Sequence, residues 1–316
     1  MTEASVGSVG AASIAKPSPF TLELMVPIGL TAVLVKFYMV TYEQFYARGA
    51  EMNYMVDVYT ECWWSSPLLF SLAYLLMVFG GKAVMQNYEP WSIAPYMFWY
   101  NVYQCIMNLV CVVAMLYEVY SNPHYTFLWG NFPEQGKGGL EIGFWVWVHY
   151  HNKYVELLDT AFMIVRKKNE QASFLHCYHH ILLIWSWFLV VKTSAGGDSY
   201  FGGMVNSFIH VIMYAYYTMP IIGIKVPTIL KKSITKCQMA QFCICLAHAA
   251  YVAYKGNCPL ILPATQAFVM INMLVLFAQF SKKAYGSKKK VDQTPVKAAI
   301  KPVVSEDMLN CPARLQ

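Results

Sequence analysis

Charged residues are scarce in this sequence. Only 13% of its 316 residues are Asp, Glu, Lys or Arg, while 57% are hydrophobic. A soluble domain carries about 25% charged residues. The chain has a formal net charge of +6, but its Lys and Arg residues gather in short stretches between long apolar ones and in the C-terminal tail. This distribution indicates membrane topology rather than a nucleic-acid-binding surface, so we expect no nucleic acid partner.

Other familiar signals are missing as well. The sequence contains no Asn-x-Ser/Thr glycosylation site, and its first residues lack the pattern of a cleaved signal peptide, which we do not expect. Its 9 Cys include no CxxC pair of the kind that holds a metal. Most lie in apolar runs, which favours buried thiols. Cys62 and Cys258 both lie where a lumenal position is expected, so a disulfide between them stays open.

Long apolar segments are what the sequence does contain. A membrane-spanning helix needs about 20 mostly apolar residues. Seven segments meet this requirement: 66–86, 97–119, 141–164, 175–192, 201–222, 235–254 and 260–282. Residues 22–41 are also mostly apolar but contain Glu23, Pro27 and Lys36, so the sequence leaves open whether they span the membrane or lie on its surface.

The same pattern divides the chain into four regions. Residues 1–21 are small and polar and predict a disordered N-terminus. Residues 22–65 hold the N-terminal apolar segment and an acidic stretch expected to be lumenal. Residues 66–285 form the predicted membrane-embedded domain, and residues 286–316 form a polar tail.

Basic residues predict the orientation. Residues 166–168, residues 225–232 and the stretch that follows the last apolar segment are rich in Lys or Arg. The alternate connections contain one Lys each, at Lys137, Lys192 and Lys255. Because cytosolic loops carry the excess of Lys and Arg, seven spans place all the basic connections in the cytosol, together with the C-terminus.

Polar side chains recur inside the predicted spans at helical spacing. The third segment contains His149, Lys153, Glu156, Asp159 and Thr160, and the fourth contains His176, His179 and His180. The fifth contains Asn206, His210, Tyr214 and Tyr217, and the sixth contains Thr235, Gln238 and Gln241. Ionisable groups in lipid are unfavourable and mark functional sites, so we expect these sets to turn inward and line one cavity.

Further polar residues in the spans support more than one reading. A similar stripe of Asn101, Gln104 and Asn108 contributes either to this cavity or to hydrogen bonds between helices. Tyr216 is expected to point away from the cavity, and His248 to be structural.

Two chemistries fit the histidine cluster. The spacing of His176, His179 and His180 resembles one box of the membrane di-iron desaturases and hydroxylases, but the chain has 8 His and no second box of this form. The alternative is acyl transfer without a metal. A neutral imidazole attacks a thioester, nearby carboxylates orient the ring, and an apolar tunnel holds the acyl chain and excludes water.

Four motifs decide between these alternatives. They are Lys153-x-x-Glu156-x-x-Asp159-Thr160, His176-x-x-His179-His180, His210-Val-x-Met213-Tyr214-x-Tyr216-Tyr217 and Thr235-x-x-Gln238-x-x-Gln241. In order and spacing they resemble the ELO family of very-long-chain fatty acid elongases, and the resemblance covers residues 65–285.

The resemblance implies an all-α polytopic membrane protein of the endoplasmic reticulum. It has seven transmembrane helices, six of which form an inverted barrel around an acyl tunnel, while the first packs outside. Such enzymes condense acyl-CoA with malonyl-CoA to give 3-oxoacyl-CoA, CoA and CO2, without a metal or other cofactor. A 3-oxoacyl-CoA reductase, a dehydratase and an enoyl reductase complete the cycle. A homodimer stays open.

The resemblance also assigns residues. His179 is the expected nucleophile, assisted by His210, His176, His180, Glu156 and Asp159. The expected substrate-binding residues are Lys153, Thr160, Asn206, Tyr214, Tyr217, Gln238, Gln241, Tyr178 and His149. Residues 171–180 and 206–210 are similar to the polyunsaturated branch of the family, which implies C18 or C20 polyunsaturated substrates. The preferred double-bond position and the chain-length ceiling stay open.

Overall fold

A computed structural model describes residues 19–47, 65–126, 129–131 and 137–285 of the chain. Within these ranges every regular element is a helix and no strand occurs. The predictions for residues 1–18, for most of the acidic lumenal stretch, for the Cys62–Cys258 pair and for the tail 286–316 fall wholly or partly outside the described residues, so they stay predictions.

The helices coincide with the apolar segments of the sequence. Their bounds are α1 Pro19–Ala47, α3 Ser65–Met85, α4 Ala94–Ser121, α5 Lys137–Val155, α6 Leu157–Val165, α7 Phe174–Thr193, α8 Ser199–Ile221, α9 Thr228–Lys255 and α10 Ile261–Tyr285. Local chemistry explains two of these ends. The Ser173 hydroxyl accepts the His176 N–H at the start of α7, and Gly256 ends α9 with a positive φ of 67°.

The third predicted span forms two helices, α5 and α6, because the backbone hydrogen-bond spacing shortens from four residues to three at Glu156. Glu156 N–H still bonds to the carbonyl four residues earlier, at Asn152, but the Asp159 N–H bonds to the Glu156 carbonyl only three residues back, at 3.1 Å. A short tight turn inside a helix often marks a functional position. Here it occurs at a buried carboxylate, between α5 and α6.

Hydropathy identifies a polytopic membrane protein. Among the described helices, five contain stretches that are long and apolar enough to cross a membrane: Met25–Glu43, Ser66–Met85, Ala94–Ser121, Phe174–Ser194 and Ile261–Ala284. The first of these belongs to α1, the segment that the sequence left undecided. Helices α5–α6, α8 and α9 carry buried polar residues such as Lys153, His210 and Gln241, which lower their mean hydropathy. The all-helical membrane class is therefore confirmed, and the count of seven crossings stays a prediction.

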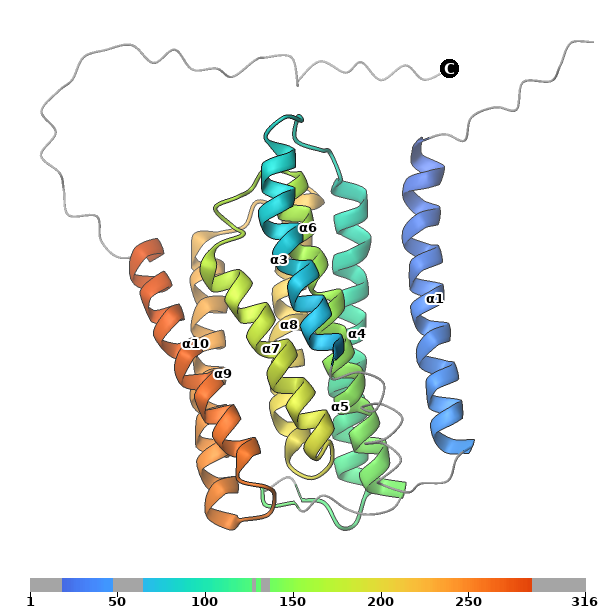
Figure 1. Cartoon of the computed structure of the whole chain (residues 1–316), viewed down its shortest axis with the longest axis vertical. Coiled ribbons are helices and arrows are strands. Elements are labelled where there is room, and N and C mark those ends of the chain that lie inside the picture. Colours follow the sequence, from blue (N-terminus) through green and yellow to red (C-terminus); the bar gives the residue numbers. More distant parts are fainter. Residues whose placement is uncertain (1–18, 48–64, 127–128, 132–136, 286–316) are drawn as a thin grey trace, which may run out of the picture.

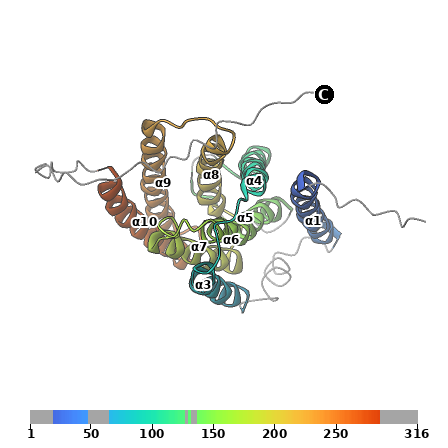
Figure 2. The ribbon, with the colours of Figure 1, turned by 90° about the horizontal axis from the view of Figure 1, so that it is seen from above.

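Six of the predicted spans form a closed ring. Going round it, α4 packs against α5, α5 against α7, α7 against α10, α10 against α9, α9 against α8, and α8 against α4. Figure 2 shows this ring from above, with α3 outside it. Helix α3 contacts α6 and α7, and α1 contacts α4 from the other side. The ring, with the first predicted span outside, is the arrangement that the resemblance implied.

The connections alternate between the two ends of the bundle. In Figure 1 the α6–α7 and α8–α9 connections and the end of α10 lie at one end, while the α7–α8 and α9–α10 turns lie at the other. The first end carries the three basic clusters of residues 166–168, 225–232 and 282–283, and we call it the basic end. Its cytosolic location follows from the positive-inside rule and stays a prediction.

The polar stripe of α4 forms hydrogen bonds with the neighbouring helix α5. Asn152 Nδ2 of α5 donates to Gln104 Oε1 at 2.8 Å, and Asn108 Nδ2 donates to the same oxygen at 3.1 Å. Gln104 and Asn108 are fully buried and line neither of the two cavities described below. Of the two roles that the sequence left open for this stripe, hydrogen bonding between helices is the one observed.

Candidate active site

A cavity of about 250 Å³ lies inside the ring, between α6, α7, α8, α9 and α10. We call it the histidine cavity. All six residues predicted to be catalytic line it: Glu156, Asp159, His176, His179, His180 and His210. They come from three helices and from the tight turn at Glu156, so the fold brings together motifs that are separated along the chain.

A buried ion pair anchors one side of this cavity. Lys153 Nζ donates to Glu156 Oε1 at 2.7 Å and to Asn206 Oδ1 at 2.8 Å. Lys153 and Glu156 are 1% and 0% exposed. Burying two charges is unfavourable unless they are paired and hydrogen-bonded, and this geometry satisfies both conditions. The pair therefore ties α5 to α8 beside the site.

The second oxygen of Glu156 faces a histidine. Among the described residues Glu156 Oε2 has no hydrogen-bond partner, and it lies 3.6 Å from His210 Nε2. His210 Nδ1 lies 2.8 Å from the Asn206 carbonyl oxygen, which can only accept. Nδ1 must therefore carry a proton, so in the neutral ring Nε2 is unprotonated and has a free lone pair. A proton can bind between Nε2 and Oε2.

The three histidines of α7 differ in their contacts. His176 Nε2 lies 2.8 Å from Thr160 Oγ1, so this nitrogen is engaged. His180 is 5% exposed, and its ring packs against those of His176 and Tyr74. His179 is half-buried, and its ring makes no hydrogen bond within the described part of the chain. His179 is thus the more accessible unengaged imidazole on the cavity wall.

Two tyrosine hydroxyls, from α8 and α4, hold the Asp159 carboxylate in place. The Tyr214 hydroxyl of α8 donates to Asp159 Oδ2 at 2.7 Å, and the Tyr100 hydroxyl of α4 lies 3.4 Å from that of Tyr214. The carboxylate is therefore fixed by two aromatic hydroxyls in series. This contact explains why the motif around His210 contains Tyr214 one turn later.

The predicted substrate-binding residues divide into two groups. Those that line the histidine cavity are Asn206, Tyr214, Tyr217, Gln238 and Gln241. Those that line neither cavity are His149, Lys153, Thr160 and Tyr178.

Contacts between helices explain the second group. His149 Nδ1 pairs with Ser207 Oγ at 2.9 Å, and the Tyr178 hydroxyl donates to Asn272 Oδ1 of α10 at 3.2 Å. These two side chains bond to neighbouring helices rather than facing the cavity. Helical phase alone does not distinguish a side chain that faces the cavity from one that faces a neighbouring helix.

The cavity wall also contains residues that the sequence did not single out. Tyr216, which was expected to point away, lines the cavity beside Tyr217. The prediction was wrong because the cavity wall at this end of α8 is not confined to one helical face: it includes both Tyr216 and the adjacent Tyr217. Lys231 and Gln171 also line the cavity near the basic end. The Lys-rich start of α9 was the available signal for Lys231.

A second, smaller cavity of about 90 Å³ continues toward the opposite end. We call it the distal chamber. It shares the lining residues Asn206 and Gln241 with the histidine cavity, so the two adjoin at these side chains. Its wall includes Leu183, Trp187 and Val190 of α7. Together the two cavities form an elongated space along the axis of the ring.

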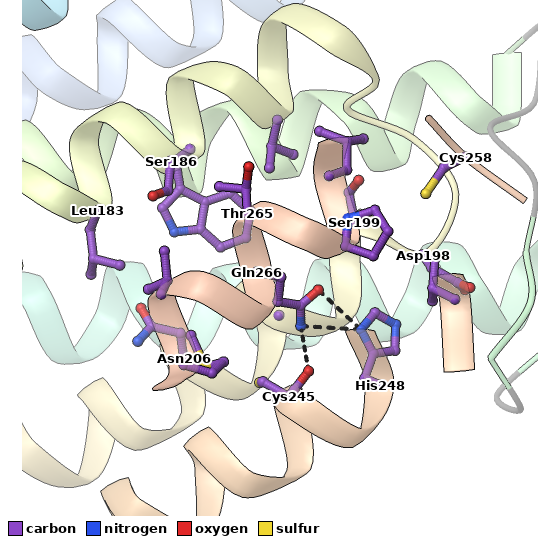
Figure 3. Close-up of a pocket in the computed structure, with 18 of the residues that line it drawn as sticks. Leu183, Ser186, Asp198, Ser199, Asn206, Cys245, His248, Cys258, Thr265 and Gln266 are labelled. Carbon is purple, nitrogen blue, oxygen red and sulfur yellow. Dashed lines mark hydrogen bonds between the residues drawn. The ribbon is translucent and has the colours of Figure 1, made fainter. Parts of the chain in front are cut away.

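Hydrogen bonds hold the residues at the far end of the distal chamber in place. Asp198, in the α7–α8 turn, accepts from the Gly130 N–H at 2.7 Å and from Asn131. Gln266 Nε2 donates to the Cys245 carbonyl at 3.0 Å and contacts His248 Nδ1 (Figure 3). His248 was expected to be structural, and it lines the chamber. Asp198 and Gln266 were not singled out, although Gln266 lies in an otherwise largely apolar segment.

The fold and these cavities define a class: a polytopic membrane protein with an internal, histidine-lined cavity inside a ring of six helices. Residues 60–293 match the model of the ELO (GNS1/SUR4) family, so the chain belongs to that family.

Characterised relatives agree. The chain is 33% identical to "Fatty acid elongase 5" of Trypanosoma cruzi, over 72% of this chain and 86% of the relative. It is 33% identical to "Very long chain fatty acid elongase 5" of Xenopus tropicalis, over 70% and 75% of the two chains. It is 34% identical to human "Very long chain fatty acid elongase 4", over 71% and 72%.

Proposed function

We propose that this chain catalyses the condensing step of very-long-chain fatty acid elongation. It joins an acyl-CoA to malonyl-CoA and forms 3-oxoacyl-CoA, CoA and CO2. Family membership and the names of the relatives support elongation. The observation that supports this chemistry is that four imidazoles and two carboxylates converge on one internal cavity, which adjoins a smaller chamber.

In the first step, His179 attacks the thioester carbonyl of the acyl-CoA. A bond forms between the ring nitrogen and the acyl carbon, the carbon–sulfur bond breaks, and CoA leaves. The ring proton ends on the CoA sulfur, so this half-reaction is balanced. The unengaged, cavity-facing ring of His179 supports its assignment as nucleophile, because the attacking nitrogen needs a free lone pair.

In the second step, malonyl-CoA loses CO2, and the resulting enolate carbon attacks the acyl-imidazole. The new carbon–carbon bond replaces the carbon–nitrogen bond and gives a 3-oxoacyl-CoA two carbons longer. The departing ring takes up one proton. His210 Nε2 and Glu156 Oε2, 3.6 Å apart, supply a place where that proton can be held near the site.

The ion pair and the tyrosines position these groups. Lys153 neutralises Glu156 and holds Asn206, whose carbonyl in turn sets the tautomer of His210. Tyr214 fixes Asp159 at the cavity wall. Preorganised groups of this kind are effective in a site that excludes water, which would otherwise hydrolyse the acyl-imidazole.

The substrate part of the proposal is a C18 or C20 polyunsaturated acyl-CoA. It rests on the resemblance of residues 171–180 and 206–210 to the polyunsaturated branch. Two of the residues that carry this resemblance, Gln171 and Asn206, line the histidine cavity. In this proposal the acyl chain extends past Asn206 and Gln241 into the distal chamber.

The cellular setting is proposed with the same reaction. The enzyme resides in the endoplasmic reticulum membrane with its basic end and C-terminus in the cytosol, where CoA esters are available. Its product then passes to a 3-oxoacyl-CoA reductase, a dehydratase and an enoyl reductase. The basic clusters of the basic end, one of which contributes Lys231 to the cavity wall, suit the phosphates of the CoA substrates.

The direct test is condensation by the purified full-length chain. Malonyl-CoA labelled with ¹⁴C is supplied with a panel of saturated and polyunsaturated acyl-CoAs, and labelled 3-oxoacyl products are measured. We expect products from polyunsaturated C18 and C20 substrates at rates above those of saturated chains of equal length. Preferred elongation of saturated chains would remove the substrate assignment and leave the reaction. Absence of condensation, with oxidation of acyl chains instead, would favour a desaturase.

A further inference from the structure

A helix outside the ring reaches the active site through two hydroxyl groups. Tyr74 of α3 is 2% exposed, and its hydroxyl lies 2.8 Å from Thr160 Oγ1 of α6. Thr160 Oγ1 lies 2.8 Å from His176 Nε2 of α7. His176 lines the histidine cavity, whereas Tyr74 and Thr160 lie behind its wall. Three helices thus contribute to one hydrogen-bonded chain that ends on a site imidazole.

The direction of this chain follows from proton counting. Thr160 has one hydroxyl proton and two neighbours. If Tyr74 donates to Thr160, Thr160 donates to His176 Nε2, and both hydroxyl protons are used. In the reverse direction Nε2 donates to Thr160 and Thr160 to Tyr74. Within the described part of the chain, the buried Tyr74 proton would then have only the sulfur of neighbouring Cys177, a weak acceptor. If Tyr74 and Nε2 both donated to the Thr160 oxygen, which can accept two hydrogen bonds, the Thr160 proton would have no acceptor among the described residues. Leaving a buried donor poorly satisfied is unfavourable, so the first direction is preferred.

We propose that Tyr74 and Thr160 are positioning residues that hold His176 as a hydrogen-bond donor. Its Nε2 accepts from Thr160, its Nδ1 carries the proton, and its ring has no free lone pair for nucleophilic attack. The relay therefore separates the roles of two histidines on one helix: His176 donates, and His179 attacks. This inference rests on the proposed condensation and adds a residue, Tyr74, that none of the four motifs contains.

A structural role alone makes a different prediction. If the two hydroxyls only satisfy one another, removing either one weakens the fold, and their effects on the chemical step are absent or independent. If they act in series, removing Thr160 disconnects Tyr74, and a second substitution at Tyr74 then has no further effect on turnover. Non-additivity in a double-mutant cycle separates the two cases.

The experiment compares Tyr74→Phe, Thr160→Val, the double variant and Thr160→Ser in the full-length protein, with kcat and KM measured for the preferred acyl-CoA. We expect kcat to fall about 5-fold in Tyr74→Phe, as for loss of one buried hydrogen bond. We expect kcat to fall about 50-fold in Thr160→Val, because no hydroxyl then fixes which nitrogen of His176 carries the proton. The double variant should match Thr160→Val, Thr160→Ser should recover most of the loss, and KM should stay within about twofold throughout.

Tyr125→Phe is the matched control. Tyr125 is a 6% exposed tyrosine whose hydroxyl accepts from the Gly197 N–H. It lies 51 residues before His176 in the sequence and lines neither of the two cavities. It should lose stability without losing kcat. Thermal unfolding of every variant identifies those that fail to fold, and Thr160→Ser retains a testable protein if Thr160→Val does not fold.

The outcomes separate this inference from the proposed function. A wild-type protein that condenses no acyl-CoA removes the reaction and the relay with it. Wild-type condensation with unchanged kcat in Tyr74→Phe and Thr160→Val overturns the relay alone. So does an additive double variant, because the hydroxyls would then act separately. A loss of kcat in Tyr125→Phe equal to that in Tyr74→Phe would assign both effects to stability.

Discussion

The two adjoining cavities differ in what their polar groups are doing. In the histidine cavity, neither Glu156 Oε2 nor the His179 ring has a hydrogen-bond partner within the described residues. In the distal chamber, Asp198 accepts from Gly130 and Asn131, and Gln266 donates to a backbone carbonyl. The exception on this wall is His248, whose Nε2 has no hydrogen-bond partner among the described residues. Groups with unused hydrogen-bonding capacity remain available to a substrate, whereas satisfied ones hold a wall in place. The first cavity is therefore suited to chemistry and the second to holding a chain.

Their positions support the same contrast. The histidine cavity includes Lys231 near the basic end, while the distal chamber ends at the α7–α8 turn and at Cys258. Asn206 and Gln241 belong to both. A substrate whose reactive end is charged and whose other end is apolar fits an elongated space of this kind. Changes in the two cavities should therefore affect different measurements.

The largest effect is expected from His179→Ala. Removing the proposed nucleophile should lower condensation by at least about 1000-fold, because the covalent route is lost. It should also abolish the acyl-protein adduct that mass spectrometry detects after incubation with acyl-CoA alone. An alanine variant that still forms the adduct would show that another residue carries the acyl group.

Breaking the buried ion pair should have the next largest effect, this time on stability. Lys153→Met leaves Glu156 buried without its cation, and we expect the free energy of unfolding to fall by about 3–5 kcal/mol. Denaturant titration in detergent measures it. The matched change in the distal chamber is Asp198→Asn, whose partners are neutral N–H groups; it should lose about 1.5–3 kcal/mol. A larger loss at Asp198 would contradict the ranking.

Filling the distal chamber should shorten the products. A Cβ at Gly202 would lie 3.7 Å from Gln266 Nε2 and 3.8 Å from Trp187 Cη2, so a side chain can enter the chamber there. Gly202→Leu should lower the longest product by about two carbons, read by gas chromatography, because the chain end loses space.

The neighbouring glycine is the control for that change. A Cβ at Gly203 would lie 3.3 Å from Met115 Cε and from Trp187 Cη2, and Gly203 does not line the chamber. Gly203→Ala should therefore lower stability and leave the product length unchanged. Equal shortening in both variants would mean that general loosening, rather than chamber volume, sets the length.

The smallest effect is expected at Tyr178. Its hydroxyl bonds to Asn272 and does not face either cavity. Tyr178→Phe should cost about 0.5–1.5 kcal/mol of stability and change kcat/KM less than about twofold. A tenfold loss of kcat/KM with polyunsaturated substrates would restore the substrate contact that the sequence predicted.

The sequence predicts the helices and the site motifs well, for identifiable reasons. Long apolar segments must be helical in lipid, since every backbone group has to be satisfied internally. Polar residues within them must turn inward, which brought Glu156, His179 and His210 to one cavity wall. The charge pattern of the connections predicts the alternation that Figure 1 shows. These features depend only on local composition and spacing.

Other features depend on how the helices pack. Helical phase placed Thr160, and the family resemblance placed Tyr178, beside true cavity residues. Contacts with Tyr74 and Asn272 direct these two side chains elsewhere. Tyr216 lies off the polar stripe of α8 but still reaches the cavity, because the wall there includes both Tyr216 and Tyr217. The distal chamber unites a turn, His248 and Gln266 from three parts of the chain. Composition and spacing thus determined a helical membrane protein with inward polar faces. Only the tertiary structure decided which of those side chains reach open space, because that depends on which neighbouring helix fills each gap.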